Sequence, residues 1–161
     1  MLSFEKPDPP AIPEIKNIEV ENFLCPWSET DYLSELDLED SIFLAAFYRS
    51  EESQAEKTTL GFIIGRINRS DVPPSAEILN IAVRKNNQGK GLGTRLLSKF
   101  LGLVEETDVE SVYLEARVSN KKALSLYEKH HFVRVGIRKN LFRNPDEDGV
   151  ILCRHSTKEK S

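Results

Sequence analysis

The chain has 161 residues, enough for one domain, and its hydrophobic fraction of 39% and charged fraction of 30% are typical of a globular protein. No apolar run approaches the ~20 residues of a membrane-spanning helix, and the N-terminus lacks the apolar core of a signal peptide. A net charge of −4 argues against binding to nucleic acid. The two cysteines, Cys25 and Cys153, are far apart and predict reduced thiols, so we expect a cytoplasmic protein.

The charge is unevenly spread along the chain. Residues 1–56 carry 14 acidic and 3 basic side chains, a balance of −11, whereas residues 57–161 carry 12 acidic and 19 basic ones, a balance of +7. One interpretation is two solvated surfaces of opposite sign. The other is that the N-terminal part meets a cationic ligand and the C-terminal part an anionic one.

The first half of the chain predicts two helices and a hairpin. Residues 1–11 are polar with three prolines and predict a flexible N-terminal tail. Residues 12–24 have a weakly helical period that Pro26 ends. Ser28 is placed to cap a short helix that would bury Tyr32, Leu33 and Leu36. The apolar runs 42–48 and 60–67, with a polar turn between them, predict a β-hairpin.

The second half alternates strands with helices. Strands are expected at 76–83 and 112–116, with a helix from 92 to about 106 between them. A second helix would begin at Ser119 or Asn120, followed by strands at 132–138 and 150–154. A strand–helix–strand unit favours a parallel pair, and hairpins favour antiparallel ones. The order therefore predicts an α/β domain over 12–155, a mixed sheet with helices on both faces, and a C-terminal tail over 156–161.

The most informative segment is the loop Gln88-Gly89-Lys90-Gly91-Leu92-Gly93, between a predicted strand and a predicted helix. Glycine allows positive φ and close approach to a ligand. The free amides and positive dipole end of the next helix suit a pyrophosphate. The spacing fits neither the Walker loop nor the dinucleotide-binding fingerprint. A plain glycine-rich turn is the competing interpretation.

The spacing of Gln88, Gly91 and Gly93 resembles the acetyl-CoA loop of the GNAT acetyltransferase superfamily. Four further runs, in the expected order, resemble its ribosomal-protein-alanine N-acetyltransferase (RimI) subfamily, and the resemblance covers about residues 12–155. They are Phe-Leu-Cys-Pro-Trp-Ser (23–28), Leu-Asn-Ile-Ala-Val (79–83), Leu-Glu-Ala-Arg-Val-Ser-Asn (114–120) and Ala-Leu-Ser-Leu-Tyr-Glu (123–128). The resemblance implies a GNAT fold with a mixed, splayed central sheet.

The resemblance also implies how acetyl-CoA, the acetyl donor, would be held. The backbone of Ile81, Ala82 and Val83 would pair with its pantetheine arm. Asn120 would bond the same arm, a role compatible with capping a helix. The pyrophosphate would be wrapped by Gly89, Lys90, Gly91, Leu92, Gly93 and Thr94. Lys121 and Lys122 stand in a first helical turn, where the dipole disfavours cations; a nearby anion would explain them, and solvated surface lysines are the alternative.

Two residues are candidates for proton transfer. Alternation along 112–117 places Glu115 opposite Val112, Leu114 and Ala116, and a carboxylate within a strand needs a partner or a role. A surface ion pair with Arg117 is the alternative. Tyr127 follows helical spacing, which by itself favours a core aromatic. The resemblance implies that Glu115 is the base and Tyr127 the acid.

No histidine or cysteine spacing predicts a metal site. The resemblance implies transfer of acetyl to the N-terminal α-amine of a protein, specifically the N-terminal alanine of a basic small-subunit ribosomal protein. Acetylation of a small-molecule amine or a lysine side chain, and a non-catalytic acyl-CoA-binding module, are the alternatives. Paired tyrosines common in the subfamily are replaced here by Leu141 and Phe142, which bears on peptide contacts. Neither a membrane nor direct contact with nucleic acid is expected.

Overall fold

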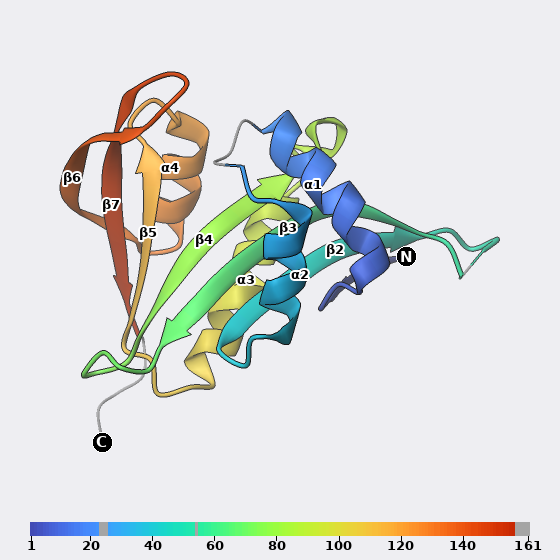
Figure 1. Ribbon diagram of the computed structural model, residues 1–161, viewed down its shortest axis with the longest axis horizontal. Helices are drawn as coiled ribbons and strands as arrows, with labels where there is room; N and C mark the ends of the chain where they lie inside the picture. Colours follow the sequence, from blue (N-terminus) through green and yellow to red (C-terminus); the bar gives the residue numbers. More distant parts are fainter. Residues whose placement is uncertain (23–25, 54, 157–161) are drawn as a thin grey trace. The chain divides into compact units, whose positions relative to one another are not determined.

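The computed structural model describes residues 1–22, 26–53 and 55–156 (Figure 1). Its elements, in chain order, are β1 (Leu2–Glu5), the 3-10 helix η1 (Pro9–Ala11), α1 (Ile12–Glu21), α2 (Glu29–Asp37), β2 (Ser41–Arg49), β3 (Lys57–Asn68), β4 (Ser75–Val83), the 3-10 helix η2 (Lys85–Asn87), α3 (Leu92–Glu105), β5 (Ser111–Arg117), α4 (Lys121–Lys129), β6 (Val133–Phe142) and β7 (Glu147–His155).

The strands form a seven-stranded sheet in the order β1-β2-β3-β4-β5-β7-β6. β1 with β2, β2 with β3, β5 with β7 and β6 with β7 are antiparallel pairs. β4 and β5 are parallel, with partners running from Ser75↔Ser111 to Glu77↔Tyr113. The predicted mixed α/β architecture is therefore confirmed, as is each strand and helix expected between 42 and 154.

The chain divides into two compact units, and β4 contributes to both. The first contains Met1–Arg66 and Leu79–Gly102, and the second Ile67–Ile78 and Leu103–Ser161. The sequence predicted one domain over 12–155, and those boundaries stay a prediction.

In the first unit, α1 and α2 cover one face of the strands, and α3 lies on the other (Figure 1). The core under α1 and α2 is aromatic: the ring of Tyr32 lies 5.9 Å from that of Phe62 and 6.1 Å from that of Phe43. The predicted cap of α2 is present, since the Ser28 side chain accepts from the amide of Asp31 and the Asp31 carboxylate accepts from the amide of Ser28. Leu33, predicted to be buried, is 39% exposed.

The predicted flexible tail over 1–11 is wrong. Leu2–Glu5 forms β1, which pairs with β2 from Leu2↔Tyr48 to Glu5↔Ala45. Pro9–Ala11 forms a 3-10 turn, and Ala11 is 6% exposed. A four-residue edge strand followed by prolines has no hydrophobic period that distinguishes it from a tail. Its contacts are with distant parts of the chain: β2 beside it, and Arg95 of α3, whose guanidinium lies 4.7 Å from the Phe4 ring. The final residues, 157–161, lie outside the described part of the chain.

In the second unit, β7 lies between β5 and the edge strand β6. Alternation along β5 is as predicted: Val112, Leu114 and Ala116 are buried, and the residues between them are not. β6 extends to Phe142, beyond the predicted end near 138, because its pairing with β7 resumes at Phe142↔Glu147 after a register shift. Cys153 is a buried free thiol, and Cys25 lies outside the described residues.

A stability prediction follows from two glycines of the first unit. A Cβ at Gly61 on β3 would lie 2.8 Å from the Ala82 carbonyl oxygen and 3.2 Å from Leu96 Cδ1, whereas one at Gly102 on α3 would meet no atom within 4 Å. We expect Gly61→Ala to destabilise the fold by about 1–3 kcal/mol through overpacking. The same change at Gly102 should stabilise it by about 0.5–1 kcal/mol, because alanine favours a helix interior.

Urea unfolding of the two variants beside the unsubstituted protein measures both effects. Both variants exchange glycine for alanine. Changes of opposite sign in the free energy of unfolding would therefore show that the close approach of β3 to β4 destabilises Gly61→Ala. Equal effects of the two substitutions would contradict it.

Candidate active site

The glycine loop has the backbone conformation that its sequence predicts. Gly89 and Gly91 have φ of +78° and +83°, the left-handed region that side chains disfavour. A Cβ at either position would meet no protein atom within 4 Å, so the space beside both residues is open. α3 begins at Leu92, directly after them. By helix geometry its first amides, those of Leu92, Gly93 and Thr94, have no acceptor within the helix and suit an anion.

Gln88 anchors the loop to two other elements of the first unit. Its side-chain amide donates to the Asn22 Oδ1 atom and to the Val83 carbonyl, both at 3.0 Å. Asn22, just after α1, donates in turn to the carbonyls of Ile18, at 2.8 Å, and Val83, at 3.1 Å. The sequence analysis missed Asn22. In the sequence it is only a polar residue near the end of a predicted helix, and nothing near it indicates a contact with Gln88. The two amides hold the loop against the end of β4.

The end of β4 presents alternating backbone groups. The amide of Arg84 donates to the Leu60 carbonyl of β3 at 2.7 Å, and the Ala82 carbonyl also faces β3 at Gly61. Backbone groups of successive strand residues point to opposite edges, so those of Ile81 and Val83 point to the other edge of β4. The Val83 carbonyl already accepts two bonds, from Asn22 and Gln88. Of the three predicted residues, Ile81 can pair with a ligand by its backbone and Val83 by its amide, whereas the backbone of Ala82 faces β3.

Glu115 lies on β5 in the second unit, with a side chain 26% exposed. Its carboxylate forms an ion pair with Arg138 of β6 at 3.2 Å. Arg117, the partner considered from sequence, is engaged elsewhere: it donates to the carbonyls of Arg143 and Pro145 at 2.8 Å and pairs with Glu147 at 3.4 Å. Glu115 is thus a half-buried carboxylate with a cationic partner from a different strand.

Tyr127 lies on the buried face of α4, 6% exposed, beside Leu124. Its ring meets that of Phe132 edge to face, with centroids 5.9 Å apart. Burial raises the pKa of the Tyr127 phenol above its usual value of about 10. The phenol therefore stays protonated at neutral pH. It has the packing of a core aromatic and the protonation state that a proton donor needs.

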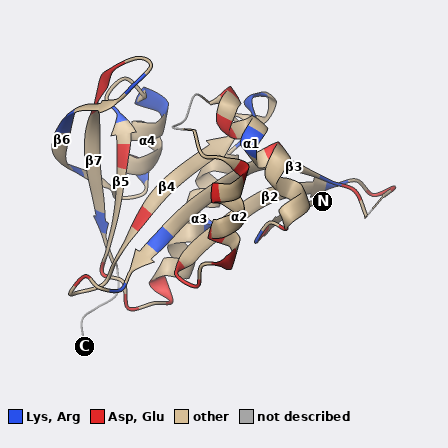
Figure 2. Ribbon diagram, in the orientation of Figure 1, with Lys and Arg blue, Asp and Glu red and all other residues tan. Residues whose placement is uncertain are grey.

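Asn120, one of the two residues predicted to cap this helix, is the N-cap of α4. Its Oδ1 atom accepts from the Ala123 amide at 3.2 Å, which leaves Nδ2 as the side-chain group suited to donate to a ligand. Lys121 and Lys122 follow in the exposed first turn, which is basic (Figure 2). Because the dipole disfavours cations there, the exposed lysines fit either solvent or a nearby anion.

A group of polar contacts missed by the sequence analysis connects the start of α4 to the β6–β7 hairpin. Ser119 donates to the Glu147 carboxylate through its amide at 3.1 Å and its hydroxyl at 2.9 Å. These bonds, with those from Arg117, lower the pKa of Glu147. Arg117 also stacks over the Phe142 ring at 4.7 Å. Phe142 thus packs on a guanidinium from β5.

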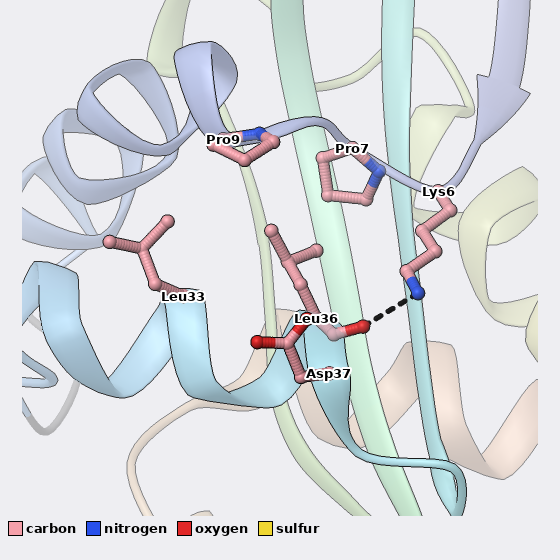
Figure 3. Close-up of a pocket in the computed structure, with 6 residues that line it drawn as sticks. All are labelled: Lys6, Pro7, Pro9, Leu33, Leu36 and Asp37. Carbon is pink, nitrogen blue, oxygen red and sulfur yellow. Dashed lines mark hydrogen bonds between the residues drawn. The ribbon is translucent and has the colours of Figure 1, made fainter.

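A pocket of about 310 Å³ lies in the first unit, between the segment before η1 and α2 (Figure 3). The Lys6 ammonium at its side donates to the Leu36 carbonyl at 2.6 Å. None of the predicted site residues lines it; its lining is Lys6, Pro7, Pro9, Leu33, Leu36 and Asp37. Among the described residues, no group of three or more His, Cys, Asp or Glu side chains is placed to hold a metal ion, and no helix has the length and apolarity needed to cross a bilayer.

The chain belongs to the acetyltransferase (GNAT) family, whose family model matches residues 12–132. It is 33% identical over 141 residues to a protein of Bacillus subtilis (strain 168) provisionally named a [ribosomal protein bS18]-alanine N-acetyltransferase, covering 88% of this chain and 87% of the relative. It is 29% identical over 144 residues to the [ribosomal protein bS18]-alanine N-acetyltransferase of Escherichia coli (strain K12), covering 88% and 89%.

Solved structures agree with this assignment. The crystal structure of the ribosomal-protein-S18-alanine N-acetyltransferase from Escherichia coli matches with a TM-score of 0.82 and 25% identity, covering 100% of this chain and 97% of that one. Arabidopsis thaliana NAA60 in complex with acetyl-CoA also matches with a TM-score of 0.82, at 16% identity over 96% and 98% of the chains, and shows the shared fold. The predicted GNAT fold and resemblance to the RimI subfamily are confirmed.

Proposed function

We propose that this acetyltransferase moves the acetyl group of acetyl-CoA to the N-terminal α-amine of a protein, specifically the N-terminal alanine of a small-subunit ribosomal protein. The observation that carries the proposal is the open loop of positive-φ glycines at the start of α3. Similarity to ribosomal-protein-alanine N-acetyltransferases over 88% of the chain supports the acceptor. With a ribosomal acceptor, the enzyme would act in the cytoplasm.

The residues present fit acetyl-CoA as a substrate. The amides from Gly89 to Thr94 would donate to its diphosphate, as the helix N-terminus of α3 favours negative charge. The backbone groups of Ile81 and Val83, with the Nδ2 atom of Asn120, would bond the amides of the pantetheine arm. Gln88 would act indirectly, by holding the loop through its bonds to Asn22 and Val83.

In the proposed reaction the neutral acceptor amine attacks the acetyl carbonyl carbon directly. A nitrogen–carbon bond forms and the carbon–sulfur bond of the thioester breaks. Glu115 accepts the proton that the amine nitrogen loses, and Tyr127 donates a proton to the departing thiolate. An α-amine has a usual pKa of about 7.7–8.0, so a carboxylate of modest basicity suffices.

Two alternatives, a different acceptor amine and a non-catalytic binding module, fit these residues less well. A lysine side chain, with a usual pKa of about 10.4, is far less often neutral and would need stronger assistance than a carboxylate paired with Arg138 offers. A module that only binds acyl-CoA would need neither the half-buried Glu115 nor a protonated phenol at Tyr127.

The test is incubation with acetyl-CoA and a peptide that carries the alanine N-terminus of a small-subunit ribosomal protein, followed by mass spectrometry. We expect one acetyl group on the α-amine. A peptide with a blocked N-terminus and internal lysines serves as the control and should remain unmodified. Acetylation of that control, or none of either peptide, would refute the proposed acceptor.

The acidic part of the chain, residues 1–56, supports recognition of a basic acceptor, and four of its carboxylates lie close together at 35–40. Of Glu35, Asp37, Glu39 and Asp40, Glu35 is 3% exposed and ion-paired with Arg66, so it cannot serve as a surface charge. Asp37 and Glu39 are exposed, in the acidic stretch at the end of α2 (Figure 2). A charge count along the sequence does not reveal this buried pair, because it does not show which carboxylates meet arginines from other elements.

We predict that Asp37→Asn with Glu39→Gln raises the KM for an arginine-bearing alanine peptide about 2- to 5-fold, the effect of one or two exposed charge pairs. The KM should rise with salt in the unsubstituted enzyme and less steeply in the variant, because salt screens exposed charges. Glu51→Gln with Glu52→Gln, in the β2–β3 turn, removes the same net charge and should have a smaller effect. Equal salt slopes in all three proteins would refute the recognition role.

A further inference from the structure

Arg138 has an unusual place among the charged residues of the second unit. It lies on the edge strand β6 with its side chain 62% exposed, and its guanidinium lies 3.2 Å from the Glu115 carboxylate. Figure 2 shows the acidic segment on β5 and the basic one on β6. Three strands bring the two residues together, since Glu115 pairs with Ile151 of β7 and Arg138 with Gly149.

A carboxylate alone is a poor neighbour for the attacking amine. Its negative charge favours the ammonium form of an amine bound beside it, and the ammonium has no lone pair with which to attack. A cation next to the same carboxylate offsets this charge. A guanidinium is a permanent cation, and Arg138 places one beside Glu115.

We propose that Arg138 is a positioning residue for acetyl transfer: it orients the Glu115 carboxylate, and its charge keeps the acceptor amine neutral. The inference rests on the proposed function. Arg138 acts through Glu115 and makes no bond to the reacting atoms. A carboxylate in this ion pair can accept a proton from the reacting amine. Because its charge is offset, it does not stabilise the unreactive ammonium form of that amine before the attack.

Several charged groups on the elements beside Glu115 have partners of their own. Arg117 on the same strand is paired with Glu147 of β7. Asp148 of β7 accepts from the Asn140 amide at 2.8 Å, and burial keeps Tyr127 of α4 protonated. Farther along β6, Arg134 is paired with Glu128 of α4 at 2.9 Å, and Lys139 follows Arg138 itself. Arg138 is therefore the arginine whose removal changes the charge at the Glu115 carboxylate.

The sign of the pH effect follows from the lost charge. Without the Arg138 cation, Glu115 stabilises the ammonium form, so the pKa of the bound amine rises. The acid limb of the kcat–pH profile, which reports the enzyme–substrate complex, then moves to higher pH. For an exposed charge a few ångströms away we expect a shift of about half a pH unit to one pH unit. The kcat of the enzyme without the Arg138 cation should fall furthest below that of the unsubstituted enzyme at low pH. The difference between the two kcat values should narrow above the pKa of the amine.

The experiment measures kcat from about pH 6 to about pH 10, across the usual pKa of an α-amine, with an alanine-terminated peptide and saturating acetyl-CoA. Arg138→Gln should shift the acid limb of the kcat–pH profile to higher pH. Arg138→Lys keeps the charge and should leave the acid limb close to its position in the unsubstituted enzyme. Arg134→Gln is the matched control, because it removes an exposed, ion-paired arginine from the same strand and should leave the profile unchanged. Thermal melting checks that all three variants are folded.

Two outcomes would overturn the inference: an acid limb in Arg138→Gln that moves no more than in Arg134→Gln, or one that Arg138→Lys fails to restore. Failure of the proposed function looks different. In that case the unsubstituted enzyme would leave the peptide α-amine unacetylated by mass spectrometry. An enzyme that acetylates the α-amine and depends on Glu115, with no separate effect of Arg138, would keep the function and discard this inference.

Discussion

Replacing Gly91 by valine should abolish the stabilisation of the fold by acetyl-CoA. A ligand at a hundredfold excess over its Kd stabilises the folded state by about 2.7 kcal/mol, which appears as a rise in Tm. Gly91 has φ of +83° and open space where its Cβ would project. A branched side chain both strains that backbone and occupies the space where phosphate oxygens would meet the amides. We therefore expect a Tm that no longer responds to acetyl-CoA.

Because strain also lowers the Tm of the free variant, the informative quantity is the difference between ligand-free and ligand-containing samples. Gly102→Ala is the control, since it alters a glycine of α3 with open surroundings and should keep the full shift. Isothermal titration of acetyl-CoA into both variants measures the Kd independently. A full thermal shift in Gly91→Val would show that the loop does not bind the diphosphate.

Tyr127→Phe should lower kcat strongly and leave acetyl-CoA binding almost unchanged. The substitution removes the phenolic proton donor but keeps the ring that packs edge to face on Phe132. Direct general acid catalysis typically contributes ~10²–10⁴-fold, and we expect a loss in that range. Tyr113→Phe is the matched control: Tyr113 is 39% exposed on β5, and its substitution should leave kcat unaltered.

Glu115→Gln should reduce turnover most at low pH, where little of the amine is neutral and help with deprotonation matters most. Proton transfer through a bridging water would make the loss smaller than that of Tyr127→Phe. Steady-state kinetics between about pH 6 and about pH 10 separate this pattern from a uniform loss. Unchanged turnover in both Glu115→Gln and Tyr127→Phe would contradict the acid–base assignment.

Short sequence patterns were enough to predict those features of the structure that depend on a few neighbouring residues. The cap at Ser28 and the cap at Asn120 depend on side chains that bond amides three residues away, so short motifs predict both. Alternation placed Glu115 opposite the buried face of β5. The glycine loop is local as well, since Gly89 and Gly91 supply the positive φ that the turn into α3 requires.

Tertiary structure alone decided which distant residues meet. Glu115 pairs with Arg138, and not with Arg117, which is only two residues away in the sequence. The reason is that strand order and register bring β6 alongside β7 and β7 alongside β5. Glu35 of α2 is buried against Arg66 of β3 because that helix packs on the face of the sheet (Figure 1). β1 is a strand because β2, distant in sequence, lies beside it and pairs with it. Hydrogen bonds between strands and ion pairs across a sheet depend on which backbones lie side by side, and neither hydrophobic period nor charge count along one segment contains that information.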